Sequence, residues 1–173
     1  MNNITGFLTK LSTVLLGCYV VPVSPGSNPA STNYLNSTLI GQEAYGGVVF
    51  FTYLSGGVVH GLVAASADEL NTYQQTAAVT QCASKTNNGY SDWVLPNKAQ
   101  ISSLFNNRFA INPNDSNGGF RSQQTVTPAT NSNYWSSTLK NDNYFYQNFY
   151  SGAQNQRSFL AAGEYYVRCI RSF

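Results

Sequence analysis

The chain has 173 residues, which is the length of one domain or of one domain with an arm. Apolar residues make up 42 % of it, enough for a core, whereas charged residues make up only 9 %, against about 25 % in an average globular protein. The net charge of +2 and the lack of a Lys/Arg stripe argue against nucleic acid as a partner. Asn, Ser, Thr, Gln and Tyr must therefore keep the surface soluble, as is common in extracellular and virion proteins.

The N-terminal part divides into an apolar segment at residues 1–23 and a Pro/Gly/Ser linker at residues 24–32 (SPGSNPAST). The run that ends at Cys18 faintly resembles a lipoprotein signal, but it is short and residues 20–23 (VVPV) continue it without a small-residue cleavage pattern. We therefore interpret residues 1–32 as an assembly arm and linker.

An apolar arm cannot stay exposed in a soluble monomer. We expect this one to mediate self-assembly into a homotrimer through its large apolar side chains, which include Leu8, Leu11, Val14, Leu15 and Leu16. No stretch approaches the ~20 apolar residues of a membrane-spanning helix, so membrane insertion is not expected. Residues 33–173 are predicted to form the folded domain.

The first part of that domain predicts a β-hairpin followed by a helix. Residues 46–53 (GGVVFFTY) and 58–65 (VVHGLVAA) are rich in β-branched and aromatic residues, and residues 55–57 (SGG) form a turn between them. Ser66 and Glu69 have the spacing of a capping box. This spacing predicts a helix that starts at Ser66 and continues to Cys82.

The rest of the chain predicts a turn, a second helix, long loops and further strands. Residues 92–97 (DWVLPN) indicate a buried turn, and residues 98–105 have one apolar helical face. Residues 106–133 have almost no periodicity and predict a long loop region. The runs at 134–137, 144–149 and 165–170 return to a strand-like composition. This order of elements predicts an α+β fold with an antiparallel sheet.

Residues 141–152 (NDNYFYQNFYSG) consist almost wholly of Asn, Gln, Tyr and Ser. Antibody paratopes use this mixture because Tyr offers large, rigid contact area and Ser and Asn offer adaptable hydrogen bonds. We predict a binding surface here; the alternative is an ordinary polar strand and loop in a charge-poor protein. The predicted contact residues are Asn141, Asn143, Tyr144, Tyr146, Asn148, Tyr150, Gln154, Asn155 and Gln156.

The two-residue period of a strand separates this segment into two sets of side chains. One set is predicted to project outward together: Tyr144, Tyr146, Asn148 and Tyr150, joined by Asn141, Asn143, Gln154 and Asn155. The other side chains are predicted to point into the core: Phe145, Phe149, Trp135 and Val167.

Catalytic and metal-binding residues are not indicated. His60 is the chain's single histidine and no CxxC pair occurs, which argues against a zinc site. Residues 112–119 (NPNDSNGG) lack the acidic and glycine positions of a calcium loop. Arg168 and Arg171 are expected to pair locally, with Asp92 or Glu164 as partners. No metal, cofactor or catalytic residue is therefore expected, and the chain is interpreted as a non-enzyme.

The three cysteines, Cys18, Cys82 and Cys169, lie far apart. The residues alone leave two alternatives open. One is a single disulfide with an odd thiol, and the other is three reduced, buried cysteines.

Several ordered motifs across residues 40–173 resemble the Lcl C-terminal domain family. They are residues 46–50 (GGVVF), 60–65 (HGLVAA), Asp68, Cys82, 92–96 (DWVLP), 134–138 (YWSST), Gly152 and 167–171 (VRCIR). The resemblance implies a C-type lectin-like fold, related to the formylglycine-generating enzymes and found in bacterial surface adhesins and phage proteins. It also implies that Cys82 and Cys169 approach within disulfide range, with Cα atoms roughly 4.4–6.8 Å apart.

Residues 134–173 also resemble the variable region of a diversity-generating retroelement target protein. This implies a hypervariable protein on a phage virion (tail or fibre) or a bacterial cell surface, which binds a host-surface receptor of protein or glycan. Three alternatives stay open: a glycan-binding adhesin without diversification, an oxidoreductase like the formylglycine-generating enzymes, and a structural virion decoration protein.

Overall fold

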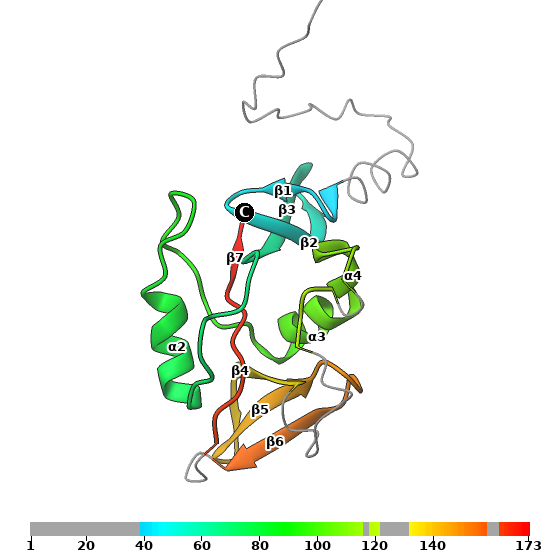
Figure 1. Ribbon diagram of the computed structural model, residues 1–173. Coiled ribbons are helices and arrows are strands. Elements are labelled where there is room, and N and C mark those ends of the chain that lie inside the picture. The colour runs from blue at the N-terminus through cyan, green and yellow to red at the C-terminus, as the bar shows by residue number, and fades with distance from the viewer. Residues whose placement is uncertain (1–38, 116–117, 122–131, 159–162) are drawn as a thin grey trace, which may run out of the picture.

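The computed structural model describes residues 39–115, 118–121, 132–158 and 163–173 (Figure 1). The arm at residues 1–32, its boundary with the domain and the expected homotrimer lie outside these residues and stay predictions. The described residues form two antiparallel sheets and short helices, so the predicted α+β class is confirmed.

The first sheet has four antiparallel strands in the order β1-β2-β3-β7. Its strands are β1 Glu43–Ala44, β2 Gly47–Ser55, β3 Val58–Ala64 and β7 Ile170–Ser172. The predicted hairpin is present as β2 and β3, and Gly56 and Gly57 turn the chain with φ of 58° and 80°. Glycine suits these two positions because positive φ strains other residues. The expected terminal strand begins at Ile170, later than predicted.

The second sheet has three antiparallel strands in the order β4-β5-β6. They are β4 Asn133–Lys140, β5 Asn143–Asn148 and β6 Gln154–Ser158. Asn141 and Asp142 connect β4 to β5 with φ of 50° and 56°, the conformation that a two-residue hairpin turn requires. The sequence did not predict β6, because QNQRS has no apolar alternation. Its pairing with β5 defines it instead.

Three helices are described: α2 Gln75–Ala83, α3 Lys98–Asn106 and α4 Arg108–Ile111. The predicted helix at 98–105 is confirmed as α3, with Ile101 and Leu104 buried. The side chain of Asn97 caps it by accepting hydrogen bonds from the backbone N–H groups of Ala99 and Gln100, both at 2.9 Å. α4 lies inside the region that was predicted to be loop.

The predicted helix start at Ser66 is wrong, because α2 begins only at Gln75. Residues 66–74 run instead beside the C-terminal segment. The backbone N–H of Glu69 donates to Val167 O at 3.0 Å, and that of Tyr73 donates to Tyr165 O at 3.0 Å. This tertiary pairing satisfies backbone groups of the segment without a helix and overrides the local capping pattern.

The two sheets lie at opposite ends of the domain (Figure 1). α2 lies on one side and α3 and α4 lie on the other, while the C-terminal segment runs from the second sheet to the first. Two buried clusters fill the space between these elements. Trp93 and Trp135 both belong to the first cluster and are buried, as expected for core residues. The C-terminal segment of the chain and α3 therefore connect the second sheet to the rest of the domain.

Candidate ligand-binding face

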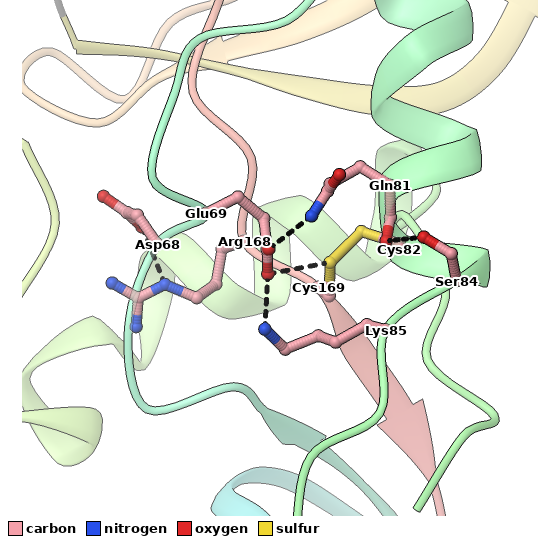
Figure 2. Close-up of a disulfide and its surroundings, with 8 residues drawn as sticks. All are labelled: Asp68, Glu69, Gln81, Cys82, Ser84, Lys85, Arg168 and Cys169. Atoms are coloured by element: carbon pink, nitrogen blue, oxygen red, sulfur yellow. Dashed lines mark hydrogen bonds and ion pairs between the residues drawn. A yellow bond between two sulfur atoms is a disulfide. The ribbon is translucent and has the colours of Figure 1, made fainter.

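A disulfide joins α2 to the C-terminal segment (Figure 2). Cys82 and Cys169 are bonded, with their Cα atoms 5.4 Å apart, inside the range that the resemblance implied. Both residues are fully buried. The bond fixes the segment that leads to the second sheet. Because both sulfurs are buried, solvent reagents do not reach them.

Glu69 lies beside the disulfide and organises the charges around it (Figure 2). Its carboxylate accepts hydrogen bonds from Lys85 Nζ at 2.6 Å and from Gln81 Nε2 at 2.9 Å. The sulfur of Cys169 lies 3.5 Å from Glu69 Oε1. A disulfide sulfur has no proton to donate, so this is a packing contact. Glu69 thus serves the scaffold and does not cap a helix.

Arg168 is buried and binds three acceptors. Its Nε donates to Asp68 Oδ1 at 2.7 Å, and its two Nη atoms donate to the backbone oxygens of Ala65 at 3.0 Å and Gly119 at 2.7 Å. Tyr134 donates a hydrogen bond to the other oxygen of Asp68 at 2.7 Å. Burial raises the pKa of Tyr134 far above its usual value, and the charge of Asp68 is the next largest cause. The partner of Arg168 is therefore Asp68, which corrects the expectation of Asp92 or Glu164.

Arg171 pairs with Asp92, as predicted. Its Nε and Nη2 donate to the two carboxylate oxygens at 2.6 Å and 2.9 Å. This fork is the geometry that Arg and carboxylate groups favour. The hydrogen bond from Arg171 lowers the pKa of Asp92 below its usual range. Arg168 and Arg171 thus both form ion pairs that connect distant parts of the domain.

The register of the second sheet divides the predicted contact residues between two faces. Tyr144 lies opposite Arg157 on β6, and Tyr146 lies opposite Asn155. On β4, Leu139 lies opposite Tyr144, and the buried Trp135 lies opposite Tyr146. Side chains of directly opposite residues share a face. Five residues of this face are exposed or half-buried, and we call them the tyrosine face: Leu139, Tyr144, Tyr146, Asn155 and Arg157.

The opposite face carries three other members of the predicted set. Asn143, Gln154 and Gln156 share this face with Phe145. Gln154 donates to Lys98 O at 3.0 Å and to Gln147 Oε1 at 3.1 Å, so it joins β6 to the start of α3. An open groove of about 470 Å³ lies there, lined by Lys98, Ala99, Ser102, Ser103, Asn106 and Gln154. The predicted set is therefore not one continuous surface.

The prediction that Asn148 projects outward is wrong. This residue is 8 % exposed, and its amide donates to Asn133 Oδ1 at 2.9 Å. Its Oδ1 accepts hydrogen bonds from the backbone N–H groups of Tyr150 at 3.0 Å and Ser151 at 2.8 Å. An Asn side chain folds back to satisfy a turn in this way. Asn148 holds the turn after β5, while Tyr150 in that turn is exposed.

Tyr146 is half-buried and packs on two core aromatics. Its ring centroid lies 6.1 Å from that of Trp135 and 4.7 Å from that of Tyr165. Burial is the largest cause that raises the pKa of Tyr146. The charge of Tyr165 and a hydrogen bond with Tyr165 raise this pKa further, and the charge of Arg157 lowers it. Arg157 Nη1 also donates to Tyr165 Oη at 3.1 Å. The tyrosine face is thus backed by a packed aromatic cluster.

The predicted inward residues are confirmed. Phe145, Phe149, Trp135 and Val167 are all buried. The sequence did not assign Leu139 to the site, because the predicted strand ended at residue 137, whereas β4 continues to Lys140. It did not assign Arg157, because β6 was not predicted. Tyr165 was placed in a strand but not in the contact set.

Among the described residues, no three His, Cys, Asp or Glu side chains gather as metal ligands, and no helix has the length and apolarity to cross a membrane. The residues that the structure does describe form a disulfide-bonded α+β domain of two antiparallel sheets, with a tyrosine-rich face on the second sheet. The family model of the Lcl C-terminal domain matches residues 52–171. The chain therefore belongs to the Lcl C-terminal domain family. A comparison with curated proteins found no match.

Proposed function

We propose that this chain is a receptor- or ligand-binding module of a phage particle or bacterial surface, built on a C-type lectin-like fold, and that it binds its target through the tyrosine face. The observation that carries the proposal is the cross-strand arrangement of Tyr144 with Arg157 and of Tyr146 with Asn155. Together these side chains offer aromatic area, an amide and a cation on one surface, a mixture that suits recognition.

The packing behind this surface supports a binding role. Tyr146 rests on Trp135 and Tyr165, and Tyr165 accepts a hydrogen bond from Arg157. Contact residues that are held before binding lose little conformational entropy when the target arrives. A sheet surface with these supports is suited to binding without rearrangement.

The division between scaffold and surface also supports diversification of residues 139–166. The side chains of Leu139, Tyr144 and Asn155 reach solvent, whereas Phe145, Phe149 and Asn148 are buried. A retroelement that changes the first group would leave the core intact. The segment 159–162 lies outside the described residues.

Sequencing tests this diversification. Chains from sibling genomes are expected to differ at Tyr144, Asn155 and Gln156 and to keep Phe145 and Phe149. An adenine-rich repeat of the 3′ end beside a reverse-transcriptase gene is expected nearby. Uniform sequences without such a repeat would reject diversification and leave the glycan-binding adhesin as the remaining form of the proposal.

The binding claim is tested with the full chain on a glycan array and on a panel of bacterial cells. Tyr144→Ala is expected to weaken binding to any positive glycan or cell by about 2 kcal/mol, as the loss of an aromatic hot spot does. Phe109→Ala removes an exposed aromatic ring from α4 and serves as the matched control. Equal loss in both variants, or full binding by Tyr144→Ala, would overturn the assignment of the tyrosine face.

Burial favours the binding role over the oxidoreductase alternative. The formylglycine-generating enzymes that this family resembles use a reactive cysteine pair next to substrate. Here Cys82 and Cys169 are bonded to each other with no exposed surface. Reactive thiols need solvent access and a stabilised thiolate.

A further inference from the structure

The β2–β3 hairpin extends beyond the rest of its sheet. β1 pairs only with Gly47 and Val48 of β2. On the other side, β7 and Phe173 pair with β3 only from Gly61 to Ala64. Among the described strands, residues 53–60 therefore pair only with each other. A two-stranded ribbon without further support is marginally stable in water.

This part of the hairpin is also apolar and uncharged. The exposed fractions are 37 % for Phe51, 49 % for Tyr53, 41 % for Leu54 and 48 % for Val58. Residues 47–64 contain no Lys, Arg, Asp or Glu. Exposed strands usually carry charges or prolines that prevent association, and a contiguous exposed apolar patch marks an interaction site.

The register places Phe51, Tyr53 and Val58 on one side of the hairpin and Leu54 on the other. Phe51 lies opposite Leu62, Tyr53 opposite His60 and Ser55 opposite Val58. The rings of Tyr53 and His60 stack with their centroids 5.4 Å apart. We call the residues Phe51, Tyr53, Val58, His60 and Leu62 the hairpin face.

We propose that residues 11–23 of this chain bind the hairpin face. This segment, LSTVLLGCYVVPV, lies outside the described residues and is as free of charge as the hairpin. Lys10 is the only charged residue in positions 1–38. Apolar contact between the two therefore buries no charge, and it removes apolar surface of both from water, which is favourable.

The connection to the domain lets the segment reach this face. The described chain starts beside β2, where Gly41 N donates to Val49 O at 2.8 Å and Val49 N donates to Gln42 O at 3.0 Å. β2 has nine residues and is therefore about 30 Å long. Residues 24–38 span up to about 50 Å when extended. The segment can thus reach the hairpin of its own chain or of a neighbouring copy.

The segment also has the residue types that add to a strand. Thr13, Val14, Val20, Val21 and Val23 are β-branched, a type favoured in strands. Strand addition supplies main-chain hydrogen bonds to an unpaired edge and places alternate side chains beside those of the hairpin face. The hairpin lies at the opposite end of the domain from β4, β5 and β6 (Figure 1). Binding of the segment would leave the tyrosine face open.

Hydrogen–deuterium exchange on the full chain tests this occupant. The variant Leu11→Asn/Leu15→Asn/Leu16→Asn makes the segment polar and leaves the hairpin unchanged. We expect the amides of residues 51–60 to exchange at least tenfold faster in this variant than in the native chain, and those of residues 133–148 to be unchanged. Equal exchange of residues 51–60 in both chains overturns the proposal, and so does faster exchange in both regions.

Cross-linking identifies the contact. With Cys82 and Cys169 bonded to each other, Cys18 lies in the proposed segment as the third cysteine. Val58→Cys is expected to form a disulfide with Cys18, whereas Leu70→Cys, which is 98 % exposed and outside the hairpin, is not. A Val58→Cys dimer that persists in a Cys18→Ser background would mean that two hairpins meet and would overturn the proposal. Equal bonding at position 70 would do the same. The mass of the bonded species shows whether the segment comes from the same copy or from another.

Discussion

Asp68 and Arg168 form a buried ion pair between residues that are 100 positions apart in the chain. The Arg168 side chain is 1 % exposed, and Asp68 also accepts the hydroxyl of Tyr134. This single carboxylate therefore joins the segment after β3, the start of β4 and the C-terminal segment. The relationship explains how the second sheet is fixed to the first.

Asp68→Asn is expected to lower the free energy of unfolding by about 3–5 kcal/mol. The change leaves the charge of Arg168 buried without its partner, which costs more than the intact pair contributes. Asp142→Asn is the matched control, because Asp142 is exposed in a turn that Asn accommodates. Urea denaturation measures both. A change below 0.5 kcal/mol for both, roughly the size of a surface substitution, would mean that the pair does not stabilise the domain.

Loss of the Cys82–Cys169 bond is expected to cost about 4 kcal/mol in the chain-entropy model, since it closes a long loop. The two residues are 87 positions apart. Cys82→Ala/Cys169→Ala should therefore unfold at a lower urea concentration than the native chain. Cys18→Ser should match the native chain. Equal midpoints for all three proteins would contradict a stabilising disulfide.

The Asp92–Arg171 pair predicts an acid-dependent part of stability. Arg171 lowers the folded-state pKa of Asp92, so the pair contributes stability above the unfolded-state pKa of about 4 and loses it as pH falls through the lower folded value. Asp92 is 58 % exposed, so solvent screening keeps the contribution small. The difference in unfolding free energy between the native chain and Asp92→Asn should be present at pH 7 and shrink as the pH falls below about 4. A difference that stays constant with pH would contradict this.

The sequence predicted the features that depend on local pattern. The β2–β3 hairpin follows from β-branched residues around two glycines, and α3 follows from its apolar face. The inward positions of Phe145 and Phe149 follow from the two-residue period of a strand. Each of these features is determined by neighbouring residues.

Features that depend on distant contacts were predicted wrongly or missed. The capping pattern at Ser66 fails because residues 66–74 pair with the C-terminal segment instead. β6 was missed because its polar sequence is a strand only through β5. Asn148 was assigned to the surface because alternation alone does not show the hydrogen bonds that its side chain makes with Asn133 and with the backbone of the following turn. These outcomes need the register and the tertiary pairing.

The self-assembly of the chain is expected to depend on residues 1–32. Light scattering should give the mass of a homotrimer for the native chain. It should give a smaller mass for Leu11→Asn/Leu15→Asn/Leu16→Asn, because the apolar surface that drives association is then lost. The variant Thr5→Ser/Thr9→Ser is the control, because it changes two residues of the arm without changing an apolar side chain to a polar one. A monomeric mass for the native chain would contradict the prediction.

The two tyrosines of the tyrosine face are expected to respond differently to substitution. Tyr146 packs on Trp135 and Tyr165, so Tyr146→Ala removes buried aromatic contacts and should lower the free energy of unfolding by about 1–3 kcal/mol. Tyr144 is half-buried at the rim of the same cluster, and Tyr144→Ala should cost about 1 kcal/mol or less. Tyr146→Phe keeps the ring and should retain most of the stability, which separates packing from the hydroxyl. Thermal and urea unfolding of the three variants measures the order. If Tyr144→Ala were the most destabilised of the three variants, it would contradict the claim that Tyr146 is the tyrosine that packs on the aromatic cluster.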